Sequence, residues 1–178
     1  MLLDIIVRVR TKFATPHRIH PMPTTEPSDR RFLPTLRELV RTYQTFDSVS
    51  SEHIRSLGLT TSQFDVIATL GNTNGLNCRD IGDKTLMVKG TLTGVLDRLE
   101  RRGLIHRTPH PDDGRSTLVQ LSDAGQRLFE KIFPEHLAFL TQTFTLLSDE
   151  FLTDLQHQLT TFRQALIQNN PNNHHDDN

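Results

Sequence analysis

The fold of this chain is decided by residues 89–125, KGTLTGVLDRLERRGLIHRTPHPDDGRSTLVQLSDAG. In the first part, leucine and valine recur at three- and four-residue steps, which predicts an amphipathic helix over about 89–102, ended by Gly103. Its buried stripe would consist of Leu92, Val95, Leu96 and Leu99. The period then changes to two strands, 104–108 and 117–121, around a turn rich in Pro, Asp and Gly. The stretch therefore predicts a long helix followed by a β-hairpin.

Amphipathic helices are also expected ahead of this stretch. One covers about residues 33–57, and a second begins after Thr60, which with Gln63 has the spacing of a capping box. A short third helix begins at Cys78, with Asn77 as its N-cap. The order of helix, short helix, long helix and hairpin is that of a winged helix-turn-helix. The expected fold class is therefore mainly α with a small β-hairpin wing.

Two more helices are expected after the hairpin. Ser122 is the N-cap of the first, and Pro134 should kink or break it near Phe133 because proline lacks the N–H that a helix needs. Ser148 caps the last helix, over about 149–168, whose leucines and phenylalanines share one face. Both helices are amphipathic and need a partner surface.

Composition narrows the class of protein. The 178 residues carry 20 Lys and Arg against 21 Asp and Glu, a formal net charge of −1, which excludes a uniformly basic nucleic-acid coat but allows a local basic face. Cys78 is the only cysteine, so a disulfide framework or a zinc site of several thiolates is excluded. No apolar run is long enough for a membrane span, and Asp4 interrupts any signal-peptide pattern. We expect a soluble, cytoplasmic protein.

Proline, glycine and polar residues divide the chain into five expected segments. These are a weakly ordered leader (1–31), a first dimerisation helix (32–57), a winged helix-turn-helix lobe (58–121), C-terminal dimerisation helices (122–168) and a disordered polar tail (169–178). A lobe of about 65 residues folds only marginally alone, so the outer helices would supply the missing burial. They either pack on their own chain or interlock with a second copy, and the ten phenylalanines favour the homodimer.

The helix over 89–102 carries the functional signal on the face opposite its leucines. That face holds Gly90, Thr93, Gly94, Asp97 and Arg101, flanked by Lys89, Thr91 and Arg98. Each glycine costs a helix about 1 kcal/mol relative to alanine, so two of them on an exposed face indicate close approach of another molecule. The major groove of DNA is a good candidate. The alternative is that Gly90 is tolerated in the first turn and Gly94 is there by chance.

Basic side chains gather around the same helix. Residues 86–108 hold five Lys and Arg against two acidic residues, a local positive charge in a slightly acidic chain. Arg101 and Arg102 have two possible roles. They either contact DNA phosphates or lie in solvent at the last turn of the helix, where their positive charge stabilises the helix dipole. Val88 stands at the N-cap position and cannot cap, so the first N–H groups are left for a phosphate or for water.

Five short motifs follow one another through the middle of the chain. They are LTTSQF (59–64), KGTLT (89–93), LDRLERRGLI (96–105), DGRS (113–116) and LSDAG (121–125). Together they resemble the MarR (multiple antibiotic resistance regulator) family of transcription regulators, over about residues 33–168. The resemblance implies a homodimer that binds pseudo-palindromic double-stranded DNA and is often released by a small ligand or an oxidant. It also implies that Arg115, oriented by Asp113, enters the minor groove; the alternative is a solvated turn.

The sequence thus predicts a sequence-specific DNA-binding transcription regulator, more specifically a homodimeric repressor, without cofactor or metal. The resemblance implies that a small ligand releases it. The helix over 89–102 would enter the major groove, with half-sites about one helical turn apart. The expected DNA-binding residues are Lys89, Gly90, Thr91, Thr93, Gly94, Arg98, Arg101, Asp113 and Arg115. The resemblance places the ligand in the cleft between the dimer helices and the lobe. The alternative class is a winged-helix module that binds a partner protein and no DNA.

Other reactive residues have weaker interpretations. Cys78, at a helix start, is a candidate redox switch, although a lone cysteine there is more often a small packing residue. The nine histidines form no i, i+4 pair on an expected helix, so we expect no zinc site. No phosphate-binding loop, Ser-His-Asp arrangement or pair of catalytic carboxylates stands out, so we expect no enzyme. Met22 is a candidate natural start; alternatively, residues 1–21 form a basic arm that adds phosphate contacts.

Overall fold

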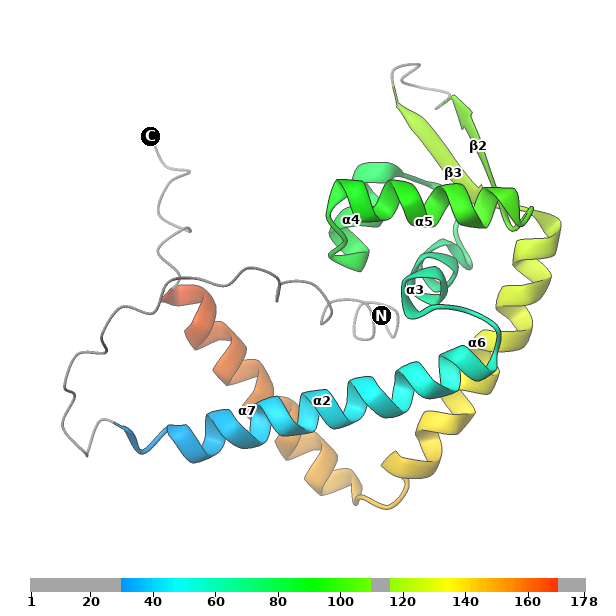
Figure 1. Cartoon of the computed structure of the whole chain (residues 1–178). Coiled ribbons are helices and arrows are strands. Elements are labelled where there is room, and N and C mark those ends of the chain that lie inside the picture. Colours follow the sequence, from blue (N-terminus) through cyan, green and yellow to red (C-terminus); the bar gives the residue numbers. More distant parts are fainter. Residues whose placement is uncertain (1–29, 110–115, 170–178) are drawn as a thin grey trace, which may run out of the picture. The chain divides into compact units, whose positions relative to one another are not determined.

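The structure is a computed structural model, in which residues 30–109 and 116–169 are described (Figure 1). Its elements in chain order are α2 (Leu33–Ser56), α3 (Thr61–Leu70), β1 (Leu76–Asn77), α4 (Cys78–Thr85), α5 (Lys89–Arg101), β2 (Ile105–Pro109), β3 (Thr117–Leu121), α6 (Asp123–Phe144) and α7 (Asp149–Gln168). The chain divides into two compact units, residues 1–136 and 137–178. The mainly α fold class with a small β element is confirmed.

The strands form a three-stranded antiparallel sheet in the order β1-β3-β2. Strand β3 pairs with β2 along its whole length, with Arg107 opposite Val119, and with β1 at its other edge, where Leu76 lies opposite the same valine. The expected hairpin is therefore present, although β2 begins one residue later than predicted. Strand β1 was not predicted, because two residues are too few to show an alternating pattern.

Side-chain caps start four of the helices where the sequence predicts them. At α3 the capping box is complete: the Gln63 N–H donates to Thr60 Oγ1 (3.3 Å) and the Thr60 N–H donates to Gln63 Oε1 (3.1 Å). The caps of α4, α6 and α7 are Asn77, Ser122 and Ser148, which accept from the N–H groups of Asp80, Gly125 and Phe151. Helices α2 and α5 end one residue earlier than expected.

Of the kink or break expected near Phe133, the break is wrong. Helix α6 continues from Asp123 to Phe144 with Pro134 inside it. Proline removes one hydrogen bond to the preceding turn. The helix nevertheless buries Phe129 and Ile132 before the proline and His136 after it, so its packing outweighs the lost bond.

One hydrophobic core holds the winged lobe together. It is built from the inner faces of α2 to α6 and from the sheet, and its largest members include Ile54, Phe64, Ile67, Leu70, Ile81, Leu96, Leu99 and Val119. The predicted stripe of α5 belongs to this core, since Leu92, Val95, Leu96 and Leu99 are at most 3% exposed. Burial of that stripe fixes which face of α5 points outward.

A buried polar cluster joins α6 to α2 beneath the lobe. His136 is fully buried; its Nδ1 lies 3.0 Å from His53 Nδ1 and its Nε2 lies 3.3 Å from Ser50 Oγ. The edge of its ring meets Phe64 of α3 at a centroid distance of 4.9 Å. Because a hydrogen bond needs one donor and one acceptor, only one of the two facing Nδ1 atoms carries a proton. No sequence pattern predicted this cluster.

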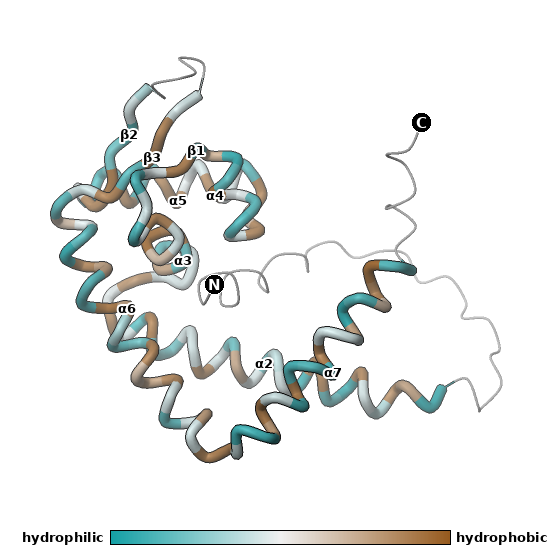
Figure 2. The backbone as a smooth tube through the Cα atoms, turned by 180° about the vertical axis from the view of Figure 1, so that it is seen from behind, coloured by the Kyte–Doolittle hydropathy of each residue, from teal (hydrophilic) through white to brown (hydrophobic). Residues whose placement is uncertain are grey.

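Apolar side chains remain uncovered on the outer helices. Among the described residues of α7 none is buried, although apolar residues recur along the helix (Figure 2). Their spacing places five of them on one face. The members of that face, Phe151, Leu155, Leu159, Phe162 and Leu166, are between 36% and 58% exposed. Helix α2 likewise exposes Leu33, Leu36, Val40 and Val49. Contiguous exposed apolar faces of this kind mark surfaces that a partner covers.

Candidate nucleic-acid interface

Helix α5 presents most of the predicted DNA-binding residues to the outside. Because its leucines and valine are buried against the lobe, the opposite side faces solvent, next to the strands β2 and β3 (Figure 1). Lys89, Gly90, Thr91, Thr93, Arg98 and Arg101 are exposed, and Gly94 is half-buried. Asp113 and Arg115 lie outside the described residues. The structure thus brings seven of the nine predicted residues onto the surface of one helix.

The glycines of this surface have no role in the packing of the lobe. A Cβ on Gly90 would meet nothing within 4 Å, and one on Gly94 would only reach the Arg98 guanidinium at 4.0 Å. Neither residue has a positive φ. In contrast, Gly58, Gly75 and Gly103 have positive φ angles, and Gly71 and Gly125 are crowded by neighbouring atoms. The fold therefore explains those glycines, whereas the packing of the lobe does not require the two on α5.

The polar side chains of this face lie along their own helix. Thr93 Oγ1 donates to the Lys89 carbonyl (2.9 Å), and Arg101 Nε donates to the Asp97 carbonyl (3.3 Å). As expected, Val88 provides no side-chain cap, so the first N–H groups of α5 have no acceptor from a capping side chain. Together with Lys89, this end of α5 offers hydrogen-bond donors and positive charge to an anion such as a phosphate.

Replacing Val88 by serine is expected to raise the free energy of unfolding by about 0.5–1 kcal/mol, because a serine at the N-cap accepts from the open N–H groups of the first turn. Val88 is 65% exposed, so its removal loses little burial. Thermal unfolding of the variant beside Val88→Ala, which removes the valine without adding an acceptor, measures the cap alone. Equal melting temperatures for the two variants would contradict the prediction.

Two of the five basic residues of 86–108, Arg102 and Arg107, make contacts within the lobe. Arg107 on β2 makes ion pairs with Asp97 (2.8 Å) and Glu100 (3.0 Å) of α5. Arg102 Nη1 donates to Gln63 Oε1 of the α3 capping box (3.4 Å). These contacts leave the local net charge as the sequence predicted, but fewer cations are free on the outer surface. The exposed cations of α5 are Lys89, Arg98 and Arg101 among the described residues of that helix. An alternating strand pattern, with Ile105 buried, could have placed Arg107 on the side facing α5.

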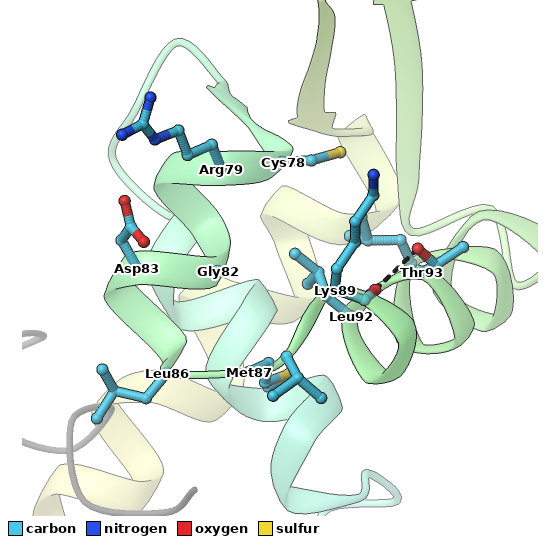
Figure 3. Close-up of a pocket in the computed structure, with 11 residues that line it drawn as sticks. Cys78, Arg79, Gly82, Asp83, Leu86, Met87, Lys89, Leu92 and Thr93 are labelled. Atoms are coloured by element: carbon cyan, nitrogen blue, oxygen red, sulfur yellow. Dashed lines mark hydrogen bonds between the residues drawn. The ribbon is translucent and has the colours of Figure 1, made fainter.

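A cavity of about 870 Å³ lies between α4 and α5 (Figure 3). Its apolar lining comes from Leu86, Met87, Val88, Leu92 and Leu96, and Gly82 of α4 leaves room beside them. Lys89 and Thr93, both expected to contact DNA, line the same cavity. Cys78, Arg79 and Asp83 of α4 also line the cavity; Cys78 extends toward α5, whereas Arg79 and Asp83 lie on the side of α4 away from α5 (Figure 3). No pattern in the sequence predicted this cavity.

Cys78 is exposed, so it is not a core packing residue. Its redox role stays a prediction.

Among the described residues, no group of three His, Cys, Asp or Glu is placed to hold a metal ion. No helix in the described ranges combines the length and the apolar character that crossing a membrane requires.

The fold and this surface define a winged helix-turn-helix protein, and the comparisons with known proteins identify its family. Residues 59–117 match the MarR family model. The HTH-type transcriptional regulator MhqR of Bacillus subtilis (strain 168) is 34% identical over 112 residues, which cover 63% of this chain and 77% of MhqR. The chain therefore belongs to the MarR family.

Solved structures share the fold. AbsC, a MarR family transcriptional regulator from Streptomyces coelicolor, superimposes with a TM-score of 0.70 at 21% identity, covering 82% of this chain and 98% of AbsC. BpsR of Bordetella bronchiseptica superimposes with a TM-score of 0.63 at 26% identity, covering 73% of this chain and 98% of BpsR. The BpsR structure is described as a mechanism for regulation of its DNA binding by 6-hydroxynicotinic acid.

Proposed function

We propose that this MarR-family transcription regulator is a homodimeric repressor that reads a pseudo-palindromic operator with α5 and is released by a small ligand. The observation that carries the proposal is the outward face of α5. The packing of the lobe does not require its two glycines, and the cations Lys89, Arg98 and Arg101 lie on the same exposed surface. A helix with small residues at its centre and cations at its margins lets the backbone approach base edges while the charges meet phosphates.

The wing supplies the second DNA contact in this proposal. Strands β2 and β3 project beside α5, and residues 110–115 between them include Arg115 and Asp113. We assign Arg115 to the minor groove next to the major groove that α5 enters, with Asp113 orienting it. The remaining expected contacts are Lys89, Thr91, Thr93, Arg98 and Arg101. Repression would be steric, because the bound dimer occupies the promoter DNA that the transcription machinery needs.

The uncovered apolar faces of the outer helices support the homodimer. A second copy of the chain presents the same faces, so pairing would bury both at once. Two lobes held together bind two half-sites as one unit, which raises affinity without any new base contact. The partner-protein module remains the alternative, and the salt dependence of binding separates the two, because DNA binding through Lys and Arg weakens steeply as salt rises.

The operator affinity of Gly94→Gln tests the proposal most directly. The Gln side chain should leave the lobe as stable as before, or more stable by up to about 1 kcal/mol, because the site is open and Gln favours helix. It projects into the space that the groove needs, so operator affinity should fall by about 1–3 kcal/mol. The operator is first selected from genomic fragments, beginning with DNA that flanks the gene.

Gly94→Ala is the size control, because its single methyl group adds the same helix propensity with little bulk. Thermal melting and a binding titration are measured for both variants on one operator. If Gly94→Gln binds like the parent protein, the outward face of α5 is not in the groove. Salt-insensitive binding of a partner protein, with no retention of DNA, would instead favour the interaction module.

The ligand in this proposal is a small aromatic acid. Support comes from BpsR, whose DNA binding is described as regulated by 6-hydroxynicotinic acid, and from the cavity between α4 and α5, where apolar side chains lie beside Lys89. A ligand seated there would compete with DNA for Lys89 and Thr93. The cleft between dimer helices and lobe stays a second candidate.

Alkylation of Cys78 distinguishes the two ligand positions, because this single exposed thiol lines the cavity. The probe is 6-hydroxynicotinic acid, with operator DNA in a parallel sample. A ligand in the cavity slows alkylation and releases DNA, whereas a ligand in the other cleft releases DNA at an unchanged alkylation rate. If the acid neither binds nor releases DNA, the proposed ligand class is wrong.

A further inference from the structure

Arg107 links the first strand of the wing to the helix proposed to read DNA. Its Nη2 lies 2.8 Å from Asp97 Oδ1 and its Nη1 lies 3.0 Å from Glu100 Oε2. The Arg107 side chain is only 25% exposed, while Asp97 and Glu100 are 47% and 40% exposed. We call this set of three residues the wing clamp.

The geometry of the wing clamp follows from local structure on both sides. Asp97 and Glu100 are three residues apart on α5, so their carboxylates lie on neighbouring positions of one helix face. Along β2, Ile105 is buried and Arg107, two residues later, lies on the same side of the strand, toward α5. A planar guanidinium can donate to both carboxylates at once, which holds the strand at one angle to the helix.

Stability alone does not account for the wing clamp. Ion pairs whose carboxylates are nearly half exposed contribute little to the free energy of unfolding. The strand is already held by five residue pairs with β3 and by the buried side chain of Ile105. What the ion pairs add is orientation: they fix β2, and with it the chain that continues toward Arg115, relative to the outward face of α5.

We propose that Arg107 is a positioning residue that sets the spacing between the major-groove contact of α5 and the minor-groove contact of the wing. This inference rests on the proposed DNA-binding function. Both terminal nitrogens of Arg107 are paired with carboxylates of α5, so in this proposal it acts through α5 and the wing rather than as a DNA contact. A small tilt of β2 at this point is amplified along the strand, and the wing then misses the groove while α5 still fits.

The double variant Asp97→Asn with Glu100→Gln gives a test whose sign separates positioning from charge. It removes two negative charges beside the DNA-binding face, so simple electrostatics predicts tighter binding to every DNA. Loss of the wing clamp predicts the opposite for the operator. We expect operator affinity to fall on the order of tenfold, the range of one lost wing contact, while binding to unrelated DNA is unchanged or stronger.

A double-mutant cycle between Arg107→Met and Arg115→Ala completes the test. If Arg107 acts by placing the wing, each single variant weakens operator binding by a similar factor, and the two together weaken it no further. The inference would be overturned if the affinity losses of the two single variants multiply in the double variant. It would also be overturned if Asp97→Asn with Glu100→Gln binds the operator more tightly than the parent protein does. An Arg115→Ala variant that binds normally would overturn it too, because the wing would then have no contact to position.

The failure of the proposed function gives a different result. In that case the parent protein itself retains no DNA at any salt concentration, before any variant is compared. Thermal melting accompanies every titration, and a variant counts only if it melts as cooperatively as the parent. Should Arg107→Met fail to fold, the double variant Asp97→Asn with Glu100→Gln still decides the question, since it keeps Arg107 and removes the two negative charges that make its hydrogen bonds ion pairs.

Discussion

Replacing Gly125 by alanine is expected to lower the free energy of unfolding by about 3 kcal/mol, although the change adds only one methyl group. Gly125 is buried in the first turn of α6, where an added Cβ would overlap the Leu104 carbonyl oxygen. That carbonyl cannot retreat easily, because it accepts the Ser122 N–H at 3.0 Å and the Ser122 hydroxyl donates to the neighbouring Gly103 carbonyl at 2.6 Å. Either the turn between α5 and β2 or the start of α6 must move.

Gly90→Ala is the matched control for this prediction. The same methyl group at Gly90 meets nothing within 4 Å, so stability should be unchanged or higher by up to about 1 kcal/mol. Chemical denaturation of both variants measures the difference. If Gly125→Ala unfolds at the same denaturant concentration as the parent, α6 does not approach the α5–β2 turn as closely as the structure indicates.

Placing two glutamates on the apolar face of α7, by Leu155→Glu with Leu159→Glu, is expected to convert the proposed dimer to monomers. Leu155 and Leu159 are two exposed leucines one turn apart. In a dimer they would be buried, and two unpaired carboxylates per copy cost several kcal/mol there. Sedimentation velocity measures the change of mass. Operator affinity should fall about 100-fold, because two half-sites are no longer bound by one linked molecule.

His157→Glu with Gln164→Glu is the control, because it adds the same two carboxylates on the opposite side of α7. Both residues are exposed and lie about half a helical turn away from the leucines, so the dimer should persist. If both double variants remain dimeric, α7 is not the dimer surface and the exposed apolar face of α2 becomes the candidate. If both dissociate, the effect is one of charge rather than of the apolar face.

The wing clamp and the close contact at Gly125 both lie near the turn between α5 and β2. The turn between α5 and β2 receives Ser122 and Gly125 from α6 on one side, and Arg107 reaches from β2 back to α5 on the other. The base of the wing is thus fixed from two directions. This arrangement suits the proposed function, in which two DNA contacts would come from different elements and would need a constant spacing.

Local sequence determined the helix starts and the outward face of α5. Thr60 with Gln63 and Asn77 cap helices through hydrogen bonds that span three residues, so their effect is visible in the sequence. The spacing of the leucines in α5 likewise fixes which residues lie opposite them, because helical geometry alone sets the angle between positions. Seven of the expected DNA-binding residues could be placed on one surface in this way.

Tertiary structure alone decided which of the basic residues are free and which glycines the fold requires. Arg107 pairs with acids seven and ten residues away because β2 packs against α5, and Gly125 is needed because α6 meets the Leu104 backbone. The cavity beside Gly82 and the continuity of α6 through Pro134 depend in the same way on neighbours distant in sequence. Hydrogen-bond caps and helical periods act over one turn, whereas these contacts arise only when a shared core brings separate elements together.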